Sequence, residues 1–490
     1  MLNSPTMSRT SDRLRQQIFR RKSVTALMAD SETHEGGLKR ALGAIDLTAL
    51  GIGAIVGAGI FVMTGVGAKQ AGPGLVASFV LAGVACSMAG LCYAEFASMI
   101  PVAGSAYSYS YATMGELVGW IIGWDLVLEY AVGAAAVASG WSGYLRVILD
   151  GFGLHIPQAL ARAPGTAPGA IVNLPALLIV FAISAVLYVG ISESARFNSI
   201  IVAIKLAVIG VVIVVGIFFV RPANWSPFAP RGFGGISQGA AYIFFAYIGF
   251  DAVSTAAEEV VDPGRDLPLG ILGSLLICTL LYVAVSGVLT GMVPYAAIDE
   301  TAPLASAFIA RGLNFVAGVI SLGAVAGLTS VLLVLLLGQS RIFFAMSRDG
   351  LLPPAFSRVH PRFRTPYIPT VITAVAVGIG AALLPIDKIA ELTNIGTLFA
   401  FVLVCLGVWI LRGIEPAMRR PFRTPLVPIV PILGVLFCTY LMMRLPLATW
   451  IRFVVWLAIG LVVYFSYGRH HSRVAATHEQ PARAAVAQPR

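Results

Sequence analysis

Charged residues are scarce in this sequence. Asp, Glu, Lys and Arg make up 11% of its 490 residues, whereas 58% are hydrophobic, and the mean hydropathy is +0.86. A soluble domain carries about 25% charged residues to cover its surface. The shortage excludes an ordinary soluble domain and indicates an integral membrane protein whose surface mostly faces lipid.

Cysteine and histidine are also few, and neither is arranged for chemistry. The five cysteines lie in apolar runs and are odd in number, which argues against a disulfide framework and favours buried free thiols. All six histidines lie outside the apolar runs described below, and no HExxH or GxSxG context occurs. We therefore expect no metal site, no cofactor and no enzymatic activity.

Long apolar runs indicate the fold class. A helix crosses a bilayer core with about 20 apolar residues, and twelve suitable runs follow one another along the chain. They cover residues 47–70, 75–99, 115–147, 171–190, 196–220, 236–258, 267–292, 313–345, 367–384, 390–411, 427–446 and 449–467. The sequence thus predicts an all-α transmembrane domain of twelve helices over residues 47–468, flanked by polar tails at 1–46 and 469–490.

The basic residues are distributed unevenly between the two sides of such a domain. Of the 33 Lys and Arg residues, 23 fall in the tails and in the loops on their side, and nine fall on the opposite side. Because cytoplasmic loops carry an excess of Lys and Arg, both tails are predicted to be cytoplasmic in a multi-pass protein of the cell membrane. This topology accounts for the net charge of +10, and nucleic acid is not expected as a partner.

The first apolar run contains "GIGAIVGAGIF", a poor helix former, since each interior glycine costs about 1 kcal/mol relative to alanine. Three interpretations compete. A dinucleotide-binding turn would need a preceding strand, which this context lacks. Gly53 and Gly57 also form a GxxxG packing pair. A helix break at Gly57, Ala58 and Gly59 is compatible with that pair, and it would present bare N–H groups suited to a carboxylate.

Lys205 lies deep in the fifth run, where a lysine costs about 2.5–3.5 kcal/mol on insertion scales. A lysine reaching toward the interface is one interpretation. The other is an ammonium that faces the interior and donates to backbone carbonyls freed by a broken helix. Irregular backbone at this depth is tolerated where it lines a cavity or is buried in protein.

A second break is expected in the sixth run if the fold contains an internal repeat, because paired broken helices mark transporter sites. Unwinding around Ala246 and Gly249 would make the carbonyls of Phe245, Ala246 and Ile248 available to an ammonium. The first and sixth runs are five apart, as a five-plus-five inverted repeat requires. The eleventh and twelfth runs would then be additional helices.

Several carboxylates also fall in or beside the apolar runs. Asp125 and Glu129 are four residues apart and therefore share one helix face. Glu129 is the better candidate for a site group or proton acceptor, whereas a structural hydrogen bond is an equal alternative for Asp125. Asp251 follows the second break, and ion pairing is the expected role at the end of the sixth run, which involves Glu258, Glu259 and Arg265.

At this point the residues resemble a known family. "GIGAIVGAGIF", "YAEFASMIPVAGSAYSYSYATMGELVGWIIGWDLVLEY", "ARFNSIIVAIK" and "FFAYIGFDAVSTAAEEVVDPGRDLPLGI" together resemble the amino acid–polyamine–organocation (APC) superfamily, within it the cationic amino acid transporter branch with its bacterial members. The resemblance runs from about residue 38 to 468. It implies the LeuT-type fold and uptake of free amino acids by alternating access.

The same resemblance implies where a substrate would bind. It places the carboxylate on backbone around Ile55, Gly57, Ala58 and Gly59, and the ammonium on the carbonyls of the second break. Lys205 falls where family members hold a lysine ammonium in place of a sodium ion, which implies sodium-independent transport and makes proton coupling plausible. Glu129 matches a glutamate of the binding region. Ala58 departs from relatives that carry a hydroxyl there, so backbone groups alone must bind the carboxylate.

The side-chain preference is expected to depend partly on Leu335 and Leu336 in the eighth run, which offers no acid to a cationic substrate. We therefore expect a small neutral L-amino acid, with a proton and the bilayer as further partners. A facilitator or antiporter that includes cationic amino acids, and a non-transporting amino acid sensor, remain alternatives. The sequence identifies neither the amino acid, the stoichiometry, the oligomeric state nor any protein partner.

Overall fold

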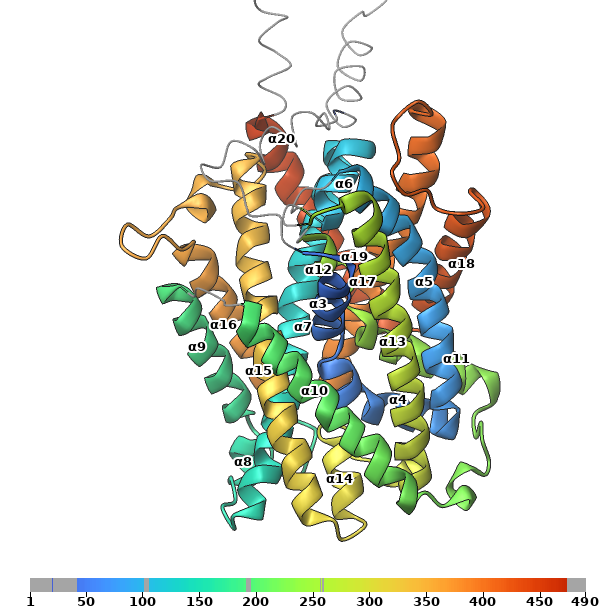
Figure 1. Cartoon of the computed structure of the whole chain (residues 1–490). Coiled ribbons are helices and arrows are strands. Elements are labelled where there is room, and N and C mark those ends of the chain that lie inside the picture. Colours follow the sequence, from blue (N-terminus) through green and yellow to red (C-terminus); the bar gives the residue numbers. More distant parts are fainter. Residues whose placement is uncertain are drawn as a thin grey trace, which may run out of the picture.

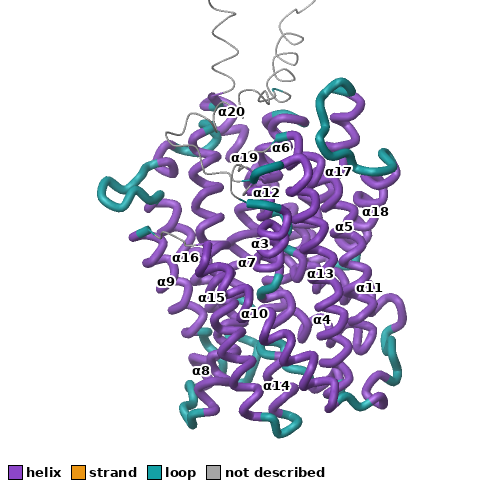
Figure 2. Tube along the Cα trace, viewed as in Figure 1, coloured by secondary structure: helices purple, strands orange, loops and turns teal. Residues whose placement is uncertain are grey.

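The computed structural model describes Arg20 and residues 42–100, 105–190, 195–255, 257 and 260–473. These residues are mostly helical, and no strand occurs among them (Figure 2). Seven of their helices are long and apolar enough to cross a membrane. They cover Gly59–Met99, Glu116–Gly151, Ile200–Phe219, Pro263–Met292, Asn314–Arg348, Ile386–Ile414 and Leu447–His471.

Each of the twelve predicted ranges contains helix. In chain order the principal helices are α3 (Ala44–Ile55), α4 (Thr64–Ala71), α5 (Leu75–Met99), α7 (Glu116–Gly151), α9 (Leu174–Val189), α10 (Ala195–Gly216), α11 (Gly232–Ile243), α12 (Ala252–Thr255), α13 (Pro263–Met292), α15 (Asn314–Arg348), α16 (Tyr367–Leu383), α17 (Ile386–Ile414), α18 (Ile429–Met443) and α19 (Leu447–Val463). Four of the apolar helices, α3, α9, α16 and α18, have only 12 to 17 residues, so length alone does not make them spans and the count of twelve stays a prediction.

The helices lie side by side in an elongated bundle (Figure 1). The short helices α6 (Ser105–Thr113) and α20 (Arg469–His471) lie at one end, which we call the α20 end, and α8 (Gln158–Ala161) and α14 (Pro303–Ile309) lie at the opposite α14 end. The most extensive packing joins α7 to α15 and α13 to both α5 and α3. The helix α7 is buried over most of its length, whereas α19 exposes most of its apolar residues. Thus α7 lies inside the bundle and α19 on its periphery.

The first apolar run is interrupted at its centre. The helix α3 ends at Ile55, Val56 adopts an extended conformation, and helical structure resumes with the wide turn Gly59–Met63 and then α4. The sixth run behaves in the same way. There α11 tightens into a 3₁₀ turn, η5 (Phe244–Tyr247), and Ile248 to Asp251 are non-helical before α12. Both interruptions are therefore present, the first predicted from its glycines and the second from the expected internal repeat.

Candidate functional site

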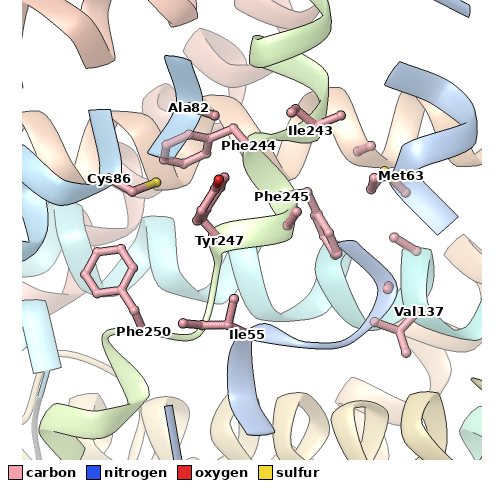
Figure 3. Packing of buried hydrophobic residues seen from close by; sticks show 14 of the residues in the cluster. Ile55, Met63, Ala82, Cys86, Val137, Ile243, Phe244, Phe245, Tyr247 and Phe250 are labelled. Carbon is pink, nitrogen blue, oxygen red and sulfur yellow. The ribbon is translucent and has the colours of Figure 1, made fainter. Parts of the chain in front are cut away.

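The two interruptions pack directly against each other. A Cβ atom on Gly59 would collide with the backbone of Ala246, so only glycine permits this approach. Gly249 has φ +113°, and a Cβ there would lie 2.8 Å from the carbonyl oxygen of Ala54. Figure 3 shows the non-helical ribbon that leaves Ile55 passing beside Phe245. Gly59 and Gly249 thus permit close contact between the backbones of the two runs.

The first interruption leaves backbone amides without helical partners. The last bond of α3 runs from the N–H of Val56 to the carbonyl of Ile52, and beyond the break the N–H of Phe61 donates to the carbonyl of Gly57. The N–H groups of Gly57, Ala58 and Gly59 lie between them, in the break and in the first turn of the following helix. First-turn N–H groups have no acceptor within their own helix, and the positive end of the helix dipole favours an anion there.

The break also leaves carbonyls at the end of α3 without their usual donors. In a continuous helix the Gly53 carbonyl would accept from Gly57. Instead it accepts from the Nζ of Lys205 on α10, at 2.9 Å. The Lys205 side chain is buried, and its methylene stem lies against Gly327 of α15, where a Cβ would be 3.1 Å from the Lys205 Cε. Lys205 therefore connects α10 to the break and to α15, and it does not reach toward an interface.

Tyr282 of α13 contacts both interruptions through one hydroxyl group. Its oxygen lies 2.9 Å from the carbonyl oxygen of Ile55 and 2.9 Å from that of Ala246. A phenol has a single hydrogen to donate, so the two carbonyls share it. The Ala246 carbonyl is thus already engaged, and the Phe245 carbonyl accepts from the N–H of Ile248 at 3.2 Å. Each carbonyl retains a second lone pair for another donor.

The carboxylates of α7 lie in the interior, as their shared face predicts. Asp125 is fully buried, rests against Gly396 of α17, and has no hydrogen-bond partner for either oxygen within the described part of the chain. Glu129 is also buried, beside the Thr397 hydroxyl, and close enough to Asp125 and Asp251 for their charges to act on it. The structure therefore groups three carboxyl groups beside the second interruption.

The other predicted site residues are distributed as follows. Leu335 of α15 and Phe245 of η5 both approach Gly133 of α7, at 3.7 and 3.8 Å from a Cβ built there. Leu336 is buried in the core, on a face of α15 turned by roughly 100° from Leu335. Arg265 is exposed in the first turn of α13. Glu258 and Glu259 lie outside the described residues, so their predicted ion pairing stays a prediction.

Two residues that hold the interruptions were not identified from the sequence, namely Tyr282 and Asn394. Asn394 of α17 donates through Nδ2 to the carbonyls of Ala241 and Tyr242, both at 2.8 Å, at the point where α11 tightens into η5. Both carried a usable signal, because each is a polar group within an apolar run.

Comparisons with known proteins identify a family and several relatives of the chain. A family model described as "Amino acid permease" matches residues 42–465. The chain is 52% identical over 462 residues to a branched-chain amino acid permease (BcaP) of Bacillus subtilis strain 168, covering 93% of this chain and 99% of that protein. It is 50% identical over 456 residues to a methylthioribose transporter of the same organism (93% and 98% covered), and 36% identical over 510 residues to the chloroplastic cationic amino acid transporter 9 of Arabidopsis thaliana (90% and 90% covered).

Proposed function

Because the chain belongs to the amino acid permease family of the APC superfamily, we propose that it carries a free L-amino acid across the cell membrane by alternating access. The family and the apolar helices make it a multi-pass membrane protein. The proposed topology has twelve spans in a LeuT-type five-plus-five arrangement with two additional helices. Both tails are cytoplasmic, so the α20 end faces the cytoplasm.

One observation supports this proposal most directly: the two interrupted helices meet at Gly59 and Ala246. In the proposed binding mode, the substrate carboxylate accepts from the N–H groups of Gly57, Ala58 and Gly59. The substrate ammonium donates to carbonyls of the second interruption, around Phe245, Ala246 and Ile248. An amino acid carries its carboxylate and its ammonium on the same carbon atom, and two facing breaks offer backbone donors on one side and backbone acceptors on the other.

Lys205 supports the sodium-independent part of the proposal. Its ammonium occupies the space between α3 and α15 and satisfies a carbonyl that a bound cation would otherwise need. A fixed charge there replaces the contribution of sodium. The proposed coupling ion is a proton, with Glu129 as the candidate acceptor, because it is buried near two other carboxyl groups. Intramembrane carboxyl groups that face the interior are common proton carriers.

The proposed substrate is a neutral amino acid. The surroundings of Gly133 are apolar, and Leu335 of α15 offers no charge to a cationic side chain. The names of two relatives specify branched-chain amino acids and methylthioribose. Neither compound carries a cationic group at the position of an amino acid side chain. The 50% identity to the methylthioribose transporter makes that thiosugar the second candidate. It lacks a carboxylate and an ammonium, so it would not use the two breaks in the same way.

Transport by purified protein in proteoliposomes tests the proposal. We expect labelled neutral amino acid to accumulate under an inward proton gradient without sodium, and Lys205→Ala to abolish accumulation in a folded protein. Lys69→Ala is the matched control, because Lys69 is partly exposed on α4 and pairs with Glu300. Counterflow without a pH effect would instead indicate a facilitator or antiporter, and binding without flux would indicate a sensor. Sodium-dependent uptake, with Lys205→Ala fully active, would contradict the mechanism.

A further inference from the structure

A cavity of about 230 Å³ lies at the surface of the bundle. It is lined by the turn before α5, by α5 itself, by α13 and by the connection between α10 and α11, through Pro73, Val76, Gly287, Trp225 and Phe228. This connection lies at the α14 end (Figure 1). No residue of either interruption is among the five that line the cavity, so it is separate from the proposed substrate site.

Hydrogen bonds hold the wall of the cavity against α13. The indole N–H of Trp225 donates to the Gly287 carbonyl at 3.2 Å, and the Asn224 side chain donates to the Gly291 carbonyl at 2.7 Å. A Cβ on Gly291 would lie 3.0 Å from the Trp225 ring. A Cβ on Gly287 would meet only Val76, at 3.8 Å. The connection is therefore packed tightly at Gly291 and leaves space one helical turn away, beside Gly287.

The side chains that line the cavity favour a hydrocarbon occupant. Their one polar atom, the indole nitrogen of Trp225, already has an acceptor. Ordered water needs two to four polar partners, whereas a dry apolar cavity of about 150 Å³ holds a benzene molecule. Val80 lies one turn from Val76 on α5, Leu280 lies two turns from Gly287 on α13, and both are exposed. The cavity therefore borders apolar surface that faces lipid in a multi-pass membrane protein.

Two arginines lie next to the cavity, closer to the α14 end. The N–H of Arg221 donates to the Gly291 carbonyl at 2.9 Å, and the Arg311 guanidinium donates to the Met292 carbonyl. Burial and the neighbouring charge of Arg221 both lower the pKa of Arg311. Within the described part of the chain, no carboxylate forms an ion pair with either arginine. This positive charge lies about 6 Å along α13 from Gly287, one helical turn farther toward the end of the bundle.

We infer that the cavity binds one acyl chain of an anionic phospholipid whose phosphate lies between Arg221 and Arg311. A phospholipid has its charged group at the membrane boundary and its chains toward the middle, which is the order of the arginines and the cavity along α13. Two guanidinium groups without a counter-charge favour a headgroup with a net negative charge and repel the choline cation of a zwitterionic one. Tryptophan is also enriched at the depth of lipid headgroups, which fits the place of Trp225 between the two.

The test is native mass spectrometry of the delipidated full-length protein with phosphatidylglycerol or phosphatidylcholine of identical chains. We expect the first bound phosphatidylglycerol to be held at least about fivefold more tightly than phosphatidylcholine, since each arginine near a membrane surface contributes about a factor of five. Arg221→Gln should remove about fivefold of the affinity for phosphatidylglycerol and leave that for phosphatidylcholine unchanged. Arg452→Gln is the matched control, because Arg452 is exposed on α19, and it should retain the preference.

A second pair of variants tests the acyl chain. Gly287→Leu fills the cavity and should weaken the binding of both lipids, with Tm retained. Gly210→Leu adds the same side chain to α10, where a Cβ has no atom within 4 Å, and should bind both lipids as the unaltered protein does. Equal affinity for the two lipids, or unchanged affinity for phosphatidylglycerol in Arg221→Gln, would overturn the inference. So would unchanged binding in Gly287→Leu, or displacement of phosphatidylglycerol by glycerol phosphate, which has no acyl chain.

Discussion

Buried carboxylates at the α20 end and in the middle of the bundle differ sharply in their surroundings. Glu95, at the end of α5, accepts from Nε and an Nη of Arg412 at 3.1 and 2.7 Å and from the N–H of Thr424 at 2.7 Å. The Nε of Arg420 lies 3.3 Å from the same carboxylate. Asp125, equally buried, has no such partner among the described residues. One buried charge is thus fully compensated, and the other carboxyl group is not.

Glu116 repeats the compensated arrangement at the start of α7. Hydroxyl groups of Tyr111, Tyr464 and Ser472 donate to its carboxylate, with the Tyr464 distance 2.9 Å. These donors belong to α6, to the turn Tyr464–Gly468 and to the segment after α20. A single acceptor therefore joins α6 and the start of α7 to the segment that contains Tyr464 and Ser472, which lie 348 and 356 positions from Glu116.

The contrast indicates that the α20 end and the middle of the bundle have different roles. Breaking a compensated buried pair leaves an unpaired charge and is costly, whereas an uncompensated carboxyl group loses little when it changes. The α20 end is therefore built to remain fixed. The middle, where the interruptions meet, holds Asp125, whose carboxyl oxygens have no hydrogen-bond partner among the described residues, and this arrangement is compatible with the proposed alternating access.

The largest effect should follow from removing the compensated charge of Glu95. Glu95→Gln leaves Arg412 and Arg420 without their counter-charge, and we expect a loss of about 3–5 kcal/mol of folding stability. The measurement is Tm in detergent together with the yield of monodisperse protein. A Tm equal to that of the unaltered protein would show that the carboxylate is not the anchor that its contacts suggest.

A smaller loss is expected for Glu116→Gln. The amide replaces a charged acceptor of three hydroxyl groups by a neutral one, which should cost about 1–3 kcal/mol. Limited proteolysis should then cleave more rapidly near Ser472, the one donor of the three that follows α20. Ser472→Ala, which removes only that donor, should show a weaker change in the same direction. Unchanged proteolysis in both variants would rule out this anchoring role.

Asp125→Asn should have little effect on stability, and this is the sharpest comparison with Glu95→Gln. The carboxyl group has no described partner to lose, and the amide removes any cost of burying a charge. We expect the free energy of unfolding to change by about 0.5 kcal/mol or less, as for an ordinary neutral substitution, with a correspondingly small change in Tm. A loss of folding stability as large as that of Glu95→Gln would mean that the two carboxylates are equivalent and that the two regions do not differ in role.

The smallest effect on stability is expected for Asp299, which lies in the loop before α14, at the α14 end of the bundle. Burial alone would raise the pKa of Asp299, but hydrogen bonds from the N–H of Ala302 and from Thr301 outweigh it and hold that pKa below its usual value. Because the pKa is lower in the folded state, the carboxylate stabilises the fold above its unfolded pKa of about 3.9. That stability is lost as the pH falls through the lower folded pKa.

The check is Tm measured between about pH 6 and pH 3, a range that brackets the usual aspartate pKa. In Asp299→Asn, Tm should lose the part of its pH dependence that comes from the Asp299 carboxyl group. The proposed transport at neutral pH should be retained. An identical pH dependence of Tm in both proteins would contradict the assignment.

The sequence predicted the elements better than the contacts between them. Glycine content located the first interruption and the expected internal repeat located the second. Of the two interpretations of Lys205, the structure shows the interior one, in which the ammonium donates to the Gly53 carbonyl. Apolar length placed helix in all twelve ranges. These features are local, so hydropathy and helix propensity reveal them.

The features that escaped prediction depend on distant pairs. Glu95 and Arg412 are 317 positions apart, and Tyr282 lies 227 positions from Ile55. No pattern within one helix reveals such partners.

The single hydroxyl hydrogen of Tyr282 has a consequence for how the two broken helices communicate. The phenol is held between the rings of Phe79 and Tyr247, at centroid distances of 5.2 and 5.5 Å, so it can turn its O–H but cannot leave. If the ammonium of the proposed substrate took one of the two carbonyls, the hydroxyl could turn fully to the other. One rotating O–H bond would then make the hydrogen bonding of each break depend on that of the other.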